Sequence, residues 1–111
     1  MINSNKIIKG NLTLIILRIL YHNGWRYGYE IRQAAQAASG GKLMITEAAL
    51  YTTLHQMEEA GWVNIKTDTV DGRRRNYYKL NPKGRRAAEK ELAAFEENIA
   101  VLRKVLRYRL P

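Results

Sequence analysis

The strongest constraint on the fold is an apolar stripe in the last third of the 111-residue chain. Six residues form it, at spacings of 4, 3, 4, 3 and 4: Ala88, Leu92, Phe95, Ile99, Leu102 and Leu106. These spacings are those of the heptad repeat, in which one helix packs against another. Asn81 followed by Pro82 predicts where the helix begins, because Asn is a favoured N-cap and Pro a favoured first helical residue.

The length of this helix predicts a partner. A helix of roughly 25 residues from Pro82 onward is about 38 Å long. The core of so short a chain cannot cover that length, so part of the stripe needs another surface. The simplest such surface is a second copy of the chain, and the sequence therefore predicts a homodimer.

Three shorter helices are predicted before it, after a polar segment, residues 1–10, that we expect to be frayed. The first covers residues 11–22 and ends at Asn23-Gly24; its continuous apolarity leaves a strand open, but its length favours a helix. The second covers residues 29–38. The third follows Thr46, an N-cap, and ends at residues 60–61, with Leu50, Leu54 and Met57 as its buried face.

A short β-hairpin is predicted between the third and the last helix. Residues 62–67 and 76–80 have strand-like composition, and the turn signal Asp71-Gly72 lies between them. The predicted fold class is therefore mostly α with a small β-hairpin. This is the layout of a winged helix-turn-helix, whose third helix enters the DNA major groove. We expect residues 1–81 to form that domain and residues 82–111 a long C-terminal dimerisation helix.

The charge of the chain indicates a polyanionic partner. Its net charge is +9 and its pI is about 10.0, which favours double-stranded DNA or other nucleic acid first and an anionic membrane surface second. There is no Cys and there are two His, so we expect no metal and no cofactor. No nucleophile–base set, carboxylate pair or phosphate-binding Gly loop is visible, so an enzyme is not expected. No apolar run has the length of a membrane span or the form of a signal peptide, which favours the cytoplasm.

Four anchors in this order resemble the PadR-like transcriptional regulators, in their short form with a single C-terminal helix. The anchors are residues 27–31 (YGYEI), 49–54 (ALYTTL), 57–63 (MEEAGWV) and 72–80 (GRRRNYYKL), followed by Gly84. The resemblance covers about residues 8–106. It implies a bacterial, cytoplasmic homodimer that binds a palindromic operator and usually represses transcription. Thr52 departs from the pattern, since many relatives have Pro there.

The hairpin arginines Arg73, Arg74 and Arg75 are the first candidates for DNA contact. Guanidinium groups at a hairpin bind phosphates or enter a minor groove. Tyr27 and Lys42, on either side of the second helix, are further candidates for contact with the phosphate backbone.

The exposed face of the third helix carries the other candidates. We expect the Tyr51 hydroxyl to contact a phosphate, and Thr52 and His55 to contact phosphates or base edges. Glu58 and Glu59 end this helix and are expected to face away from DNA, because carboxylates repel phosphate.

Phe95 is the aromatic member of the stripe, and its simplest role is to pack in the core of the dimer interface. Multidrug-sensing members of the family imply a second role, since an aromatic residue at about this place lines a flat pocket between subunits. Phe95 is therefore a candidate wall for a small aromatic effector. Two other function classes stay open: a non-regulatory nucleic-acid-binding or architectural protein, and a membrane-surface or adaptor protein that uses the basic last helix.

Overall fold

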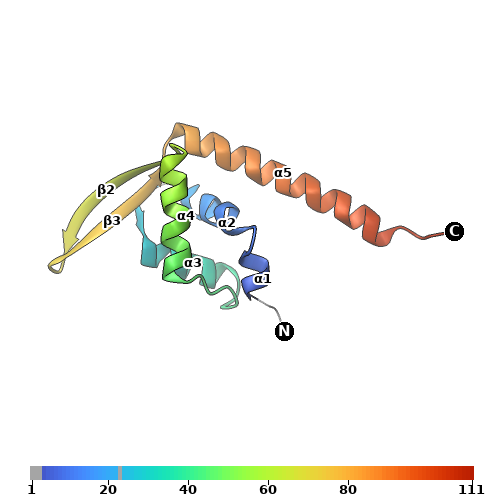
Figure 1. The fold of residues 1–111 in the computed structure, drawn as a ribbon, viewed down its shortest axis with the longest axis horizontal. Helices are drawn as coiled ribbons and strands as arrows, with labels where there is room; N and C mark the ends of the chain where they lie inside the picture. Colours follow the sequence, from blue (N-terminus) through green and yellow to red (C-terminus); the bar gives the residue numbers. More distant parts are fainter. Residues whose placement is uncertain (1–3, 23) are drawn as a thin grey trace.

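The computed structural model describes residues 4–22 and 24–111. A helical body and a small sheet lie at one end of the molecule, and a long helix projects from them (Figure 1). The elements, in chain order, are α1 (Ser4–Ile8), α2 (Leu12–Leu20), β1 (Arg26–Tyr27), α3 (Gly28–Ala38), α4 (Glu47–Glu59), β2 (Val63–Val70), β3 (Arg73–Leu80) and α5 (Pro82–Arg107). The predicted helices, hairpin and final long helix are all present.

Local capping signals set the ends of the two helices that matter most for function. The Thr46 hydroxyl accepts a hydrogen bond from the Ala49 amide at 3.2 Å, and the Asn81 side chain accepts one from the Gly84 amide at 2.8 Å. Each bond satisfies a backbone donor that the start of a helix leaves free. Gly61, with a φ of +76°, ends α4 in the left-handed conformation. The predicted ends of α4 and the predicted start of α5 are confirmed.

The hairpin is longer than its sequence pattern indicated. β2 and β3 pair antiparallel along their whole lengths, up to Val70 opposite Arg73. Asp71 and Gly72 form the turn with φ angles of +51° and +74°, as the Asp-Gly signal predicts. The arginine run therefore lies within β3, directly after the turn, and the hairpin forms a wing that projects from the body (Figure 1).

A third strand, which the sequence pattern did not predict, closes the other edge of the sheet. In β1, Arg26 pairs with Tyr78 and Tyr27 with Tyr77, which gives the strand order β1-β3-β2. Because side chains alternate across a sheet, Tyr78 points into the core and is buried while Tyr77 points to the other face. Burial raises the pKa of the Tyr78 hydroxyl.

The core lies where the helices meet the inner face of the sheet. Its buried residues are Ile16, Leu17 and Leu20 of α2, Ile31 and Ala35 of α3, Ile45 just before α4, Leu50, Leu54 and Met57 of α4, Val63, Tyr78 and Leu80 of the sheet, and Ala88 of α5. The buried face predicted for α4 is confirmed. This packing fixes α4 against the sheet, so the exposed face of α4 and the wing keep a set geometry.

The start of α5 belongs to this body, and its later turns do not. A Cβ on Gly84 would collide with the carbonyl oxygen of Trp62, so only glycine allows this close approach. Ala88 is fully buried within its own chain. The prediction that Ala88 lies in a dimer interface is therefore wrong: the first turns of α5 pack on α2 and the sheet, and no surface of Ala88 is left for a partner.

The prediction of a frayed N-terminal segment is also wrong for residues 4–8, which form α1. The Ser4 hydroxyl accepts a hydrogen bond from the Met44 amide at 3.2 Å, and the Asn11 side chain donates one to the Ile7 carbonyl at 2.7 Å. Ile8 packs against the core. Residues 1–3, and Asn23 of the predicted helix end, lie outside the described residues.

Candidate nucleic-acid interface

A groove lies between the wing and the N-terminal half of α4. Its lining residues are Tyr27, Tyr51, Thr67, Arg74, Arg75 and Asn76, and its volume is about 500 Å³. A second hollow of about 370 Å³ adjoins it and adds Gly28, Tyr29, Arg32, Glu47 and Arg73. We call the two together the wing groove. Five of the eight residues predicted to contact DNA line it, so the fold brings separate parts of the sequence to one place: Tyr27, Tyr51, Arg73, Arg74 and Arg75.

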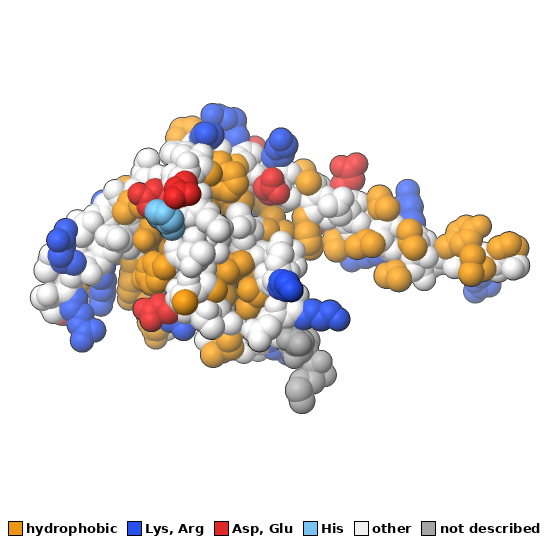
Figure 2. Space-filling view, in the orientation of Figure 1, with side chains coloured by type: hydrophobic (Ala, Val, Ile, Leu, Met, Phe, Trp, Pro, Cys, Tyr) orange, Lys and Arg blue, Asp and Glu red, His pale blue; other side chains and the backbone are white. Residues whose placement is uncertain are grey.

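The three arginines of β3 differ in their surroundings. Arg73 and Arg74 are exposed, and Arg75 is partly buried. The Arg75 guanidinium carbon lies 4.5 Å from the centre of the Tyr27 ring, a cation–π contact. Lysine and arginine side chains mark this end of the molecule in Figure 2. The wing thus presents a cationic edge beside the exposed face of α4.

Tyr51 connects α4 to the start of α3. It is 44% exposed, and a Cβ built on Gly28 would lie 2.5 Å from the Tyr51 hydroxyl oxygen. The absence of a side chain at Gly28 therefore leaves the space in which the Tyr51 ring lies. Tyr51 is one of the residues that line the wing groove, where its phenolic hydroxyl is available as a donor.

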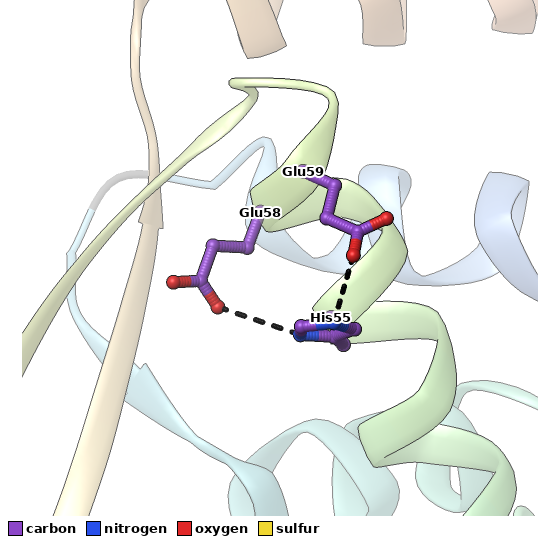
Figure 3. Close-up of polar contacts among 3 residues, drawn as sticks. All are labelled: His55, Glu58 and Glu59. Atoms are coloured by element: carbon purple, nitrogen blue, oxygen red, sulfur yellow. Dashed lines mark ion pairs between the residues drawn. The ribbon is translucent and has the colours of Figure 1, made fainter.

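His55 lies one turn further along α4, with carboxylates beside it. Its Nε2 is 2.9 Å from Oε1 of Glu59, and its Nδ1 is 4.0 Å from Oε2 of Glu58 (Figure 3). Both carboxylates point toward the imidazole from the C-terminal end of α4. Because carboxylates repel phosphate, this arrangement disfavours a phosphate contact from His55. A contact with a base edge stays a prediction.

The remaining candidates lie on or just before α4. Thr52 is exposed on the helix, and Lys42 is exposed in the loop that precedes it. The Thr46 hydroxyl is used as the N-cap. Their contacts with nucleic acid stay predictions.

Six residues that line the wing groove were not among the predicted contacts: Gly28, Tyr29, Arg32, Glu47, Thr67 and Asn76. Gly28 and Tyr29 directly follow Tyr27, a predicted contact, and this adjacency was the available signal. Arg32 donates from Nε to the Ile45 carbonyl at 2.8 Å, which ties α3 to the segment before α4. Nothing in the local sequence pattern indicated that long-range bond.

Comparison with known proteins identifies the family of this chain. Residues 16–90 match the transcriptional regulator PadR-like family. The chain belongs to this family. An uncharacterized protein of Lysinibacillus sphaericus is 35% identical to it over 80 residues, which make up 71% of this chain and 72% of that protein.

Solved structures show the same fold as this PadR-like chain. A transcriptional regulator from Clostridium thermocellum superimposes with a TM-score of 0.80 at 27% identity, covering 89% of this chain and 96% of that one. Bacillus subtilis PadR, in its complex with operator DNA, superimposes with a TM-score of 0.65 at 21% identity, covering 73% of this chain and 46% of that one. The family resemblance and the winged-helix fold class predicted from the sequence are confirmed. The chain is a PadR-family transcriptional regulator.

The second half of α5 in this PadR-like chain carries an uncovered apolar face. Leu102 is 55% exposed and Leu106 is 82% exposed, although both belong to the heptad stripe. Hydrophobic side chains follow the projecting helix in Figure 2. Leu92 and Ile99 are half-buried, so the stripe becomes more exposed with distance from the body.

Phe95 lies at the edge of an apolar groove beside α5. The groove has a volume of about 560 Å³ and is lined by residues of α1, α2, α3 and α5, together with Asn11, Ser39 and Leu43 from the connecting segments. Ile7, Leu14 and Ile15 are among its apolar residues, and Arg18 and Glu96 are its charged ones. The structure thus places Phe95 against a concave apolar surface and not on a bare helix.

Neither a metal site nor a membrane span is found in the part of the chain that the structure describes. Among residues 4–22 and 24–111, no cluster of His, Asp and Glu has the arrangement that holds a metal ion. Within the same residues, no helix has the length and apolarity that crossing a membrane requires.

Proposed function

We propose that this PadR-like regulator is a homodimeric, sequence-specific repressor that binds double-stranded DNA in the cytoplasm. The wing groove carries the proposal. It puts arginine guanidinium groups and a tyrosine hydroxyl beside the exposed face of α4, on one surface of the protomer. In a winged helix, α4 reads base edges in the major groove and the wing contacts the phosphate backbone. The complex of Bacillus subtilis PadR with operator DNA supports this use of the shared fold.

The contact residues divide into two kinds. Arg73, Arg74, Arg75 and Lys42 would neutralise phosphates, and the Tyr51 hydroxyl would donate a hydrogen bond to one. These contacts give affinity without sequence preference. Thr52 and His55 on α4 are the candidates for base edges. Residues 63–80, the two wing strands and their turn, hold five Lys and Arg against two Asp, and this net charge of +3 supports the wing as a phosphate-binding element.

The exposed half of the α5 stripe supports the homodimer. Four apolar side chains of the stripe are available to a second copy beyond the body: Phe95, Ile99, Leu102 and Leu106, with Leu92 at the near end. Two such helices packed against each other would remove them from water and set the distance between two copies of α4. A twofold dimer presents its α4 helices to two half-sites related by the same symmetry, so we propose a palindromic operator.

Direct binding tests this function. The probe is a labelled duplex from the promoter of the regulator's own gene, compared with a shuffled duplex of equal length and composition. Specific regulation requires a preference of at least about 10³ for the promoter duplex. Equal affinity for both duplexes would contradict the proposed repressor and support a non-regulatory nucleic-acid-binding or architectural protein.

A matched pair of variants then tests the wing. Arg74→Ala should weaken binding to both duplexes alike, and it should lower the log–log salt slope by roughly one for each phosphate that a protomer no longer neutralises. The control is Arg86→Ala, which removes the same charge from an exposed position in the second turn of α5. If both variants lower affinity and slope equally, the effect belongs to net charge and the wing has no special role.

The groove at Phe95 supports one addition to the proposed function, namely that a small aromatic effector releases the repressor from its operator. In the proposed dimer, each Phe95 lies at an apolar groove beside the dimer interface, where a flat ring can stack at about 0.5–1.5 kcal/mol per aromatic contact beyond burial. Planar aromatic compounds should therefore bind wild type and not Phe95→Ala, with a lower operator affinity when bound. Equal binding to both proteins would exclude Phe95 as the pocket wall.

A further inference from the structure

Tyr27 lies where three elements of the wing groove meet. It is the last residue of β1 and the N-cap of α3, and its amide donates a hydrogen bond to Oε1 of Glu30 at 3.1 Å. Its backbone also pairs with Tyr77 in the sheet. The backbone of Tyr27 is therefore held by the start of α3 and by its pairing with β3 at the base of the wing.

The strand register brings Arg75 to this ring. Arg75 and Tyr77 are two residues apart in β3, so they lie on the same face of the sheet. Tyr27 is directly opposite Tyr77, which makes Arg75 its diagonal neighbour, within reach of a long side chain. The rings of Tyr27 and Tyr77 meet edge to face at 5.6 Å and 61°, and the Arg75 guanidinium carbon lies 4.5 Å from the centre of the Tyr27 ring.

This contact distinguishes Arg75 from its neighbours. Within the described residues, neither Arg73 nor Arg74 has a ring or an ion-pair partner, and both are exposed. A free arginine side chain loses considerable rotamer freedom when it binds a ligand. The ring contact restricts Arg75 before binding, and it uses none of the five N–H donors of the guanidinium. Arg75 is thus both restrained and still able to donate.

We propose that Tyr27 is a positioning residue, whose ring holds the Arg75 guanidinium at the wing groove so that it is already placed for a DNA phosphate. This inference rests on the DNA-binding function proposed above. Restraint of a side chain in its bound position raises affinity, because less freedom is lost on association. The role belongs to the aromatic ring and not to the hydroxyl, and that distinction makes it testable.

The test is a double-mutant cycle on duplex affinity with Arg75→Ala, Tyr27→Leu and both changes together. Tyr27→Phe is the matched control, because it keeps the ring and removes the hydroxyl. An exposed cation–π contact corresponds to about a two- to five-fold change in affinity per protomer. We expect Tyr27→Leu to weaken binding by that factor, Tyr27→Phe to bind like wild type, and Tyr27→Leu to have no further effect in the Arg75→Ala background.

Two results in this cycle would overturn the inference. If Tyr27→Phe weakens binding as much as Tyr27→Leu, the hydroxyl contacts DNA directly. If the Tyr27→Leu and Arg75→Ala effects multiply, the two residues act independently. In both cases wild type still binds its duplex, so the proposed function stands while the positioning role fails.

A second measurement needs no DNA. In the free protein, the Tyr27 ring current should shift the side-chain methylene proton signals of Arg75 in the NMR spectrum away from those of Arg73 and Arg74. The shift should persist in Tyr27→Phe and disappear in Tyr27→Leu. Arg75 signals that match those of Arg73 and Arg74 in wild type would show that the ring does not hold the guanidinium. If wild type shows the shift but binds no duplex, the proposed function fails and the phosphate role of Arg75 fails with it.

Discussion

Gly28→Ala should lower the affinity of this protein for DNA while its free energy of unfolding changes little. Gly28 is buried at the first position of α3, and its φ is not in the left-handed region. Alanine therefore fits the backbone, and replacing glycine within a helix stabilises a protein by about 0.4–1 kcal/mol where there is room. The net change in the free energy of unfolding also depends on the atoms that the added methyl group contacts.

The added Cβ meets Tyr51. It would lie 2.5 Å from the hydroxyl oxygen, 2.9 Å from Cζ and 3.2 Å from Cδ2 of Leu50. Overpacking of this kind costs about 1–3 kcal/mol when the neighbour cannot move. Tyr51 can move, because it is 44% exposed and the clashing atoms are at the far end of its side chain. We therefore expect the ring to swing out, and the net change in the free energy of unfolding to stay within about 1 kcal/mol.

The affinity for DNA should change more than the stability. Displacement of the Tyr51 hydroxyl from the wing groove removes one hydrogen bond to a charged phosphate in each protomer, worth about 1.5–3 kcal/mol. This corresponds to about a ten- to 150-fold loss per protomer. Denaturant unfolding and duplex titration measure the two quantities on the same sample.

The Tyr51→Ala background provides the control. With the ring absent, Gly28→Ala should no longer weaken DNA binding, and its effect on stability should come only from the helix-favouring methyl group and its 3.2 Å contact with Cδ2 of Leu50. The reasoning is refuted if Gly28→Ala binds the duplex as wild type does, or if it weakens binding to the same extent when Tyr51 is already alanine.

Two further predictions follow from other parts of the molecule. Ile99→Asp should place an unpaired charge in the proposed α5 dimer interface, at a cost of several kcal/mol, so sedimentation should show monomer or aggregate. The control is Asn98→Asp on the exposed side of α5, which should stay dimeric. A dimer in both variants would show that α5 does not form the interface. Burial raises the pKa of Tyr78 above its ordinary value of 10.0, so the neutral hydroxyl is favoured in the folded state. Its contribution to stability is fully present below pH about 10 and is lost as the pH rises through the folded pKa. Tyr78→Phe should flatten this alkaline loss in denaturant titrations, and an unchanged pH dependence would contradict the assignment.

Features set by neighbouring residues were predictable from the sequence. The Thr46 and Asn81 caps, the left-handed Gly61 and the Asp71-Gly72 turn each act through bonds within a few residues. The same holds for the buried face of α4, which follows from helical periodicity. The cationic wing was visible as a run of three arginines next to a turn.

Features set by distant residues were not predictable. β1 has two residues, too few to show alternation, and it exists because β3 has an edge to pair with. Ala88 fits the heptad stripe as well as Leu102 does, and only the packed body shows that one is covered by its own chain and the other is not. The carboxylates beside His55 were expected to face away from DNA, but their contact with the imidazole depends on side-chain positions that spacing alone does not give.

If the uncovered half of α5 pairs with a second copy as proposed, the amount of this regulator in the cell becomes part of its response. Leu102, Val105 and Leu106 are each more than half exposed in one protomer, so a single protomer exposes a strip of apolar side chains to water. If the form that binds DNA is the proposed pair, its abundance rises with the square of the protomer concentration while pairs are scarce. Promoter occupancy would then change more steeply than protein level, and a modest rise or fall in synthesis would switch the target gene without any small molecule.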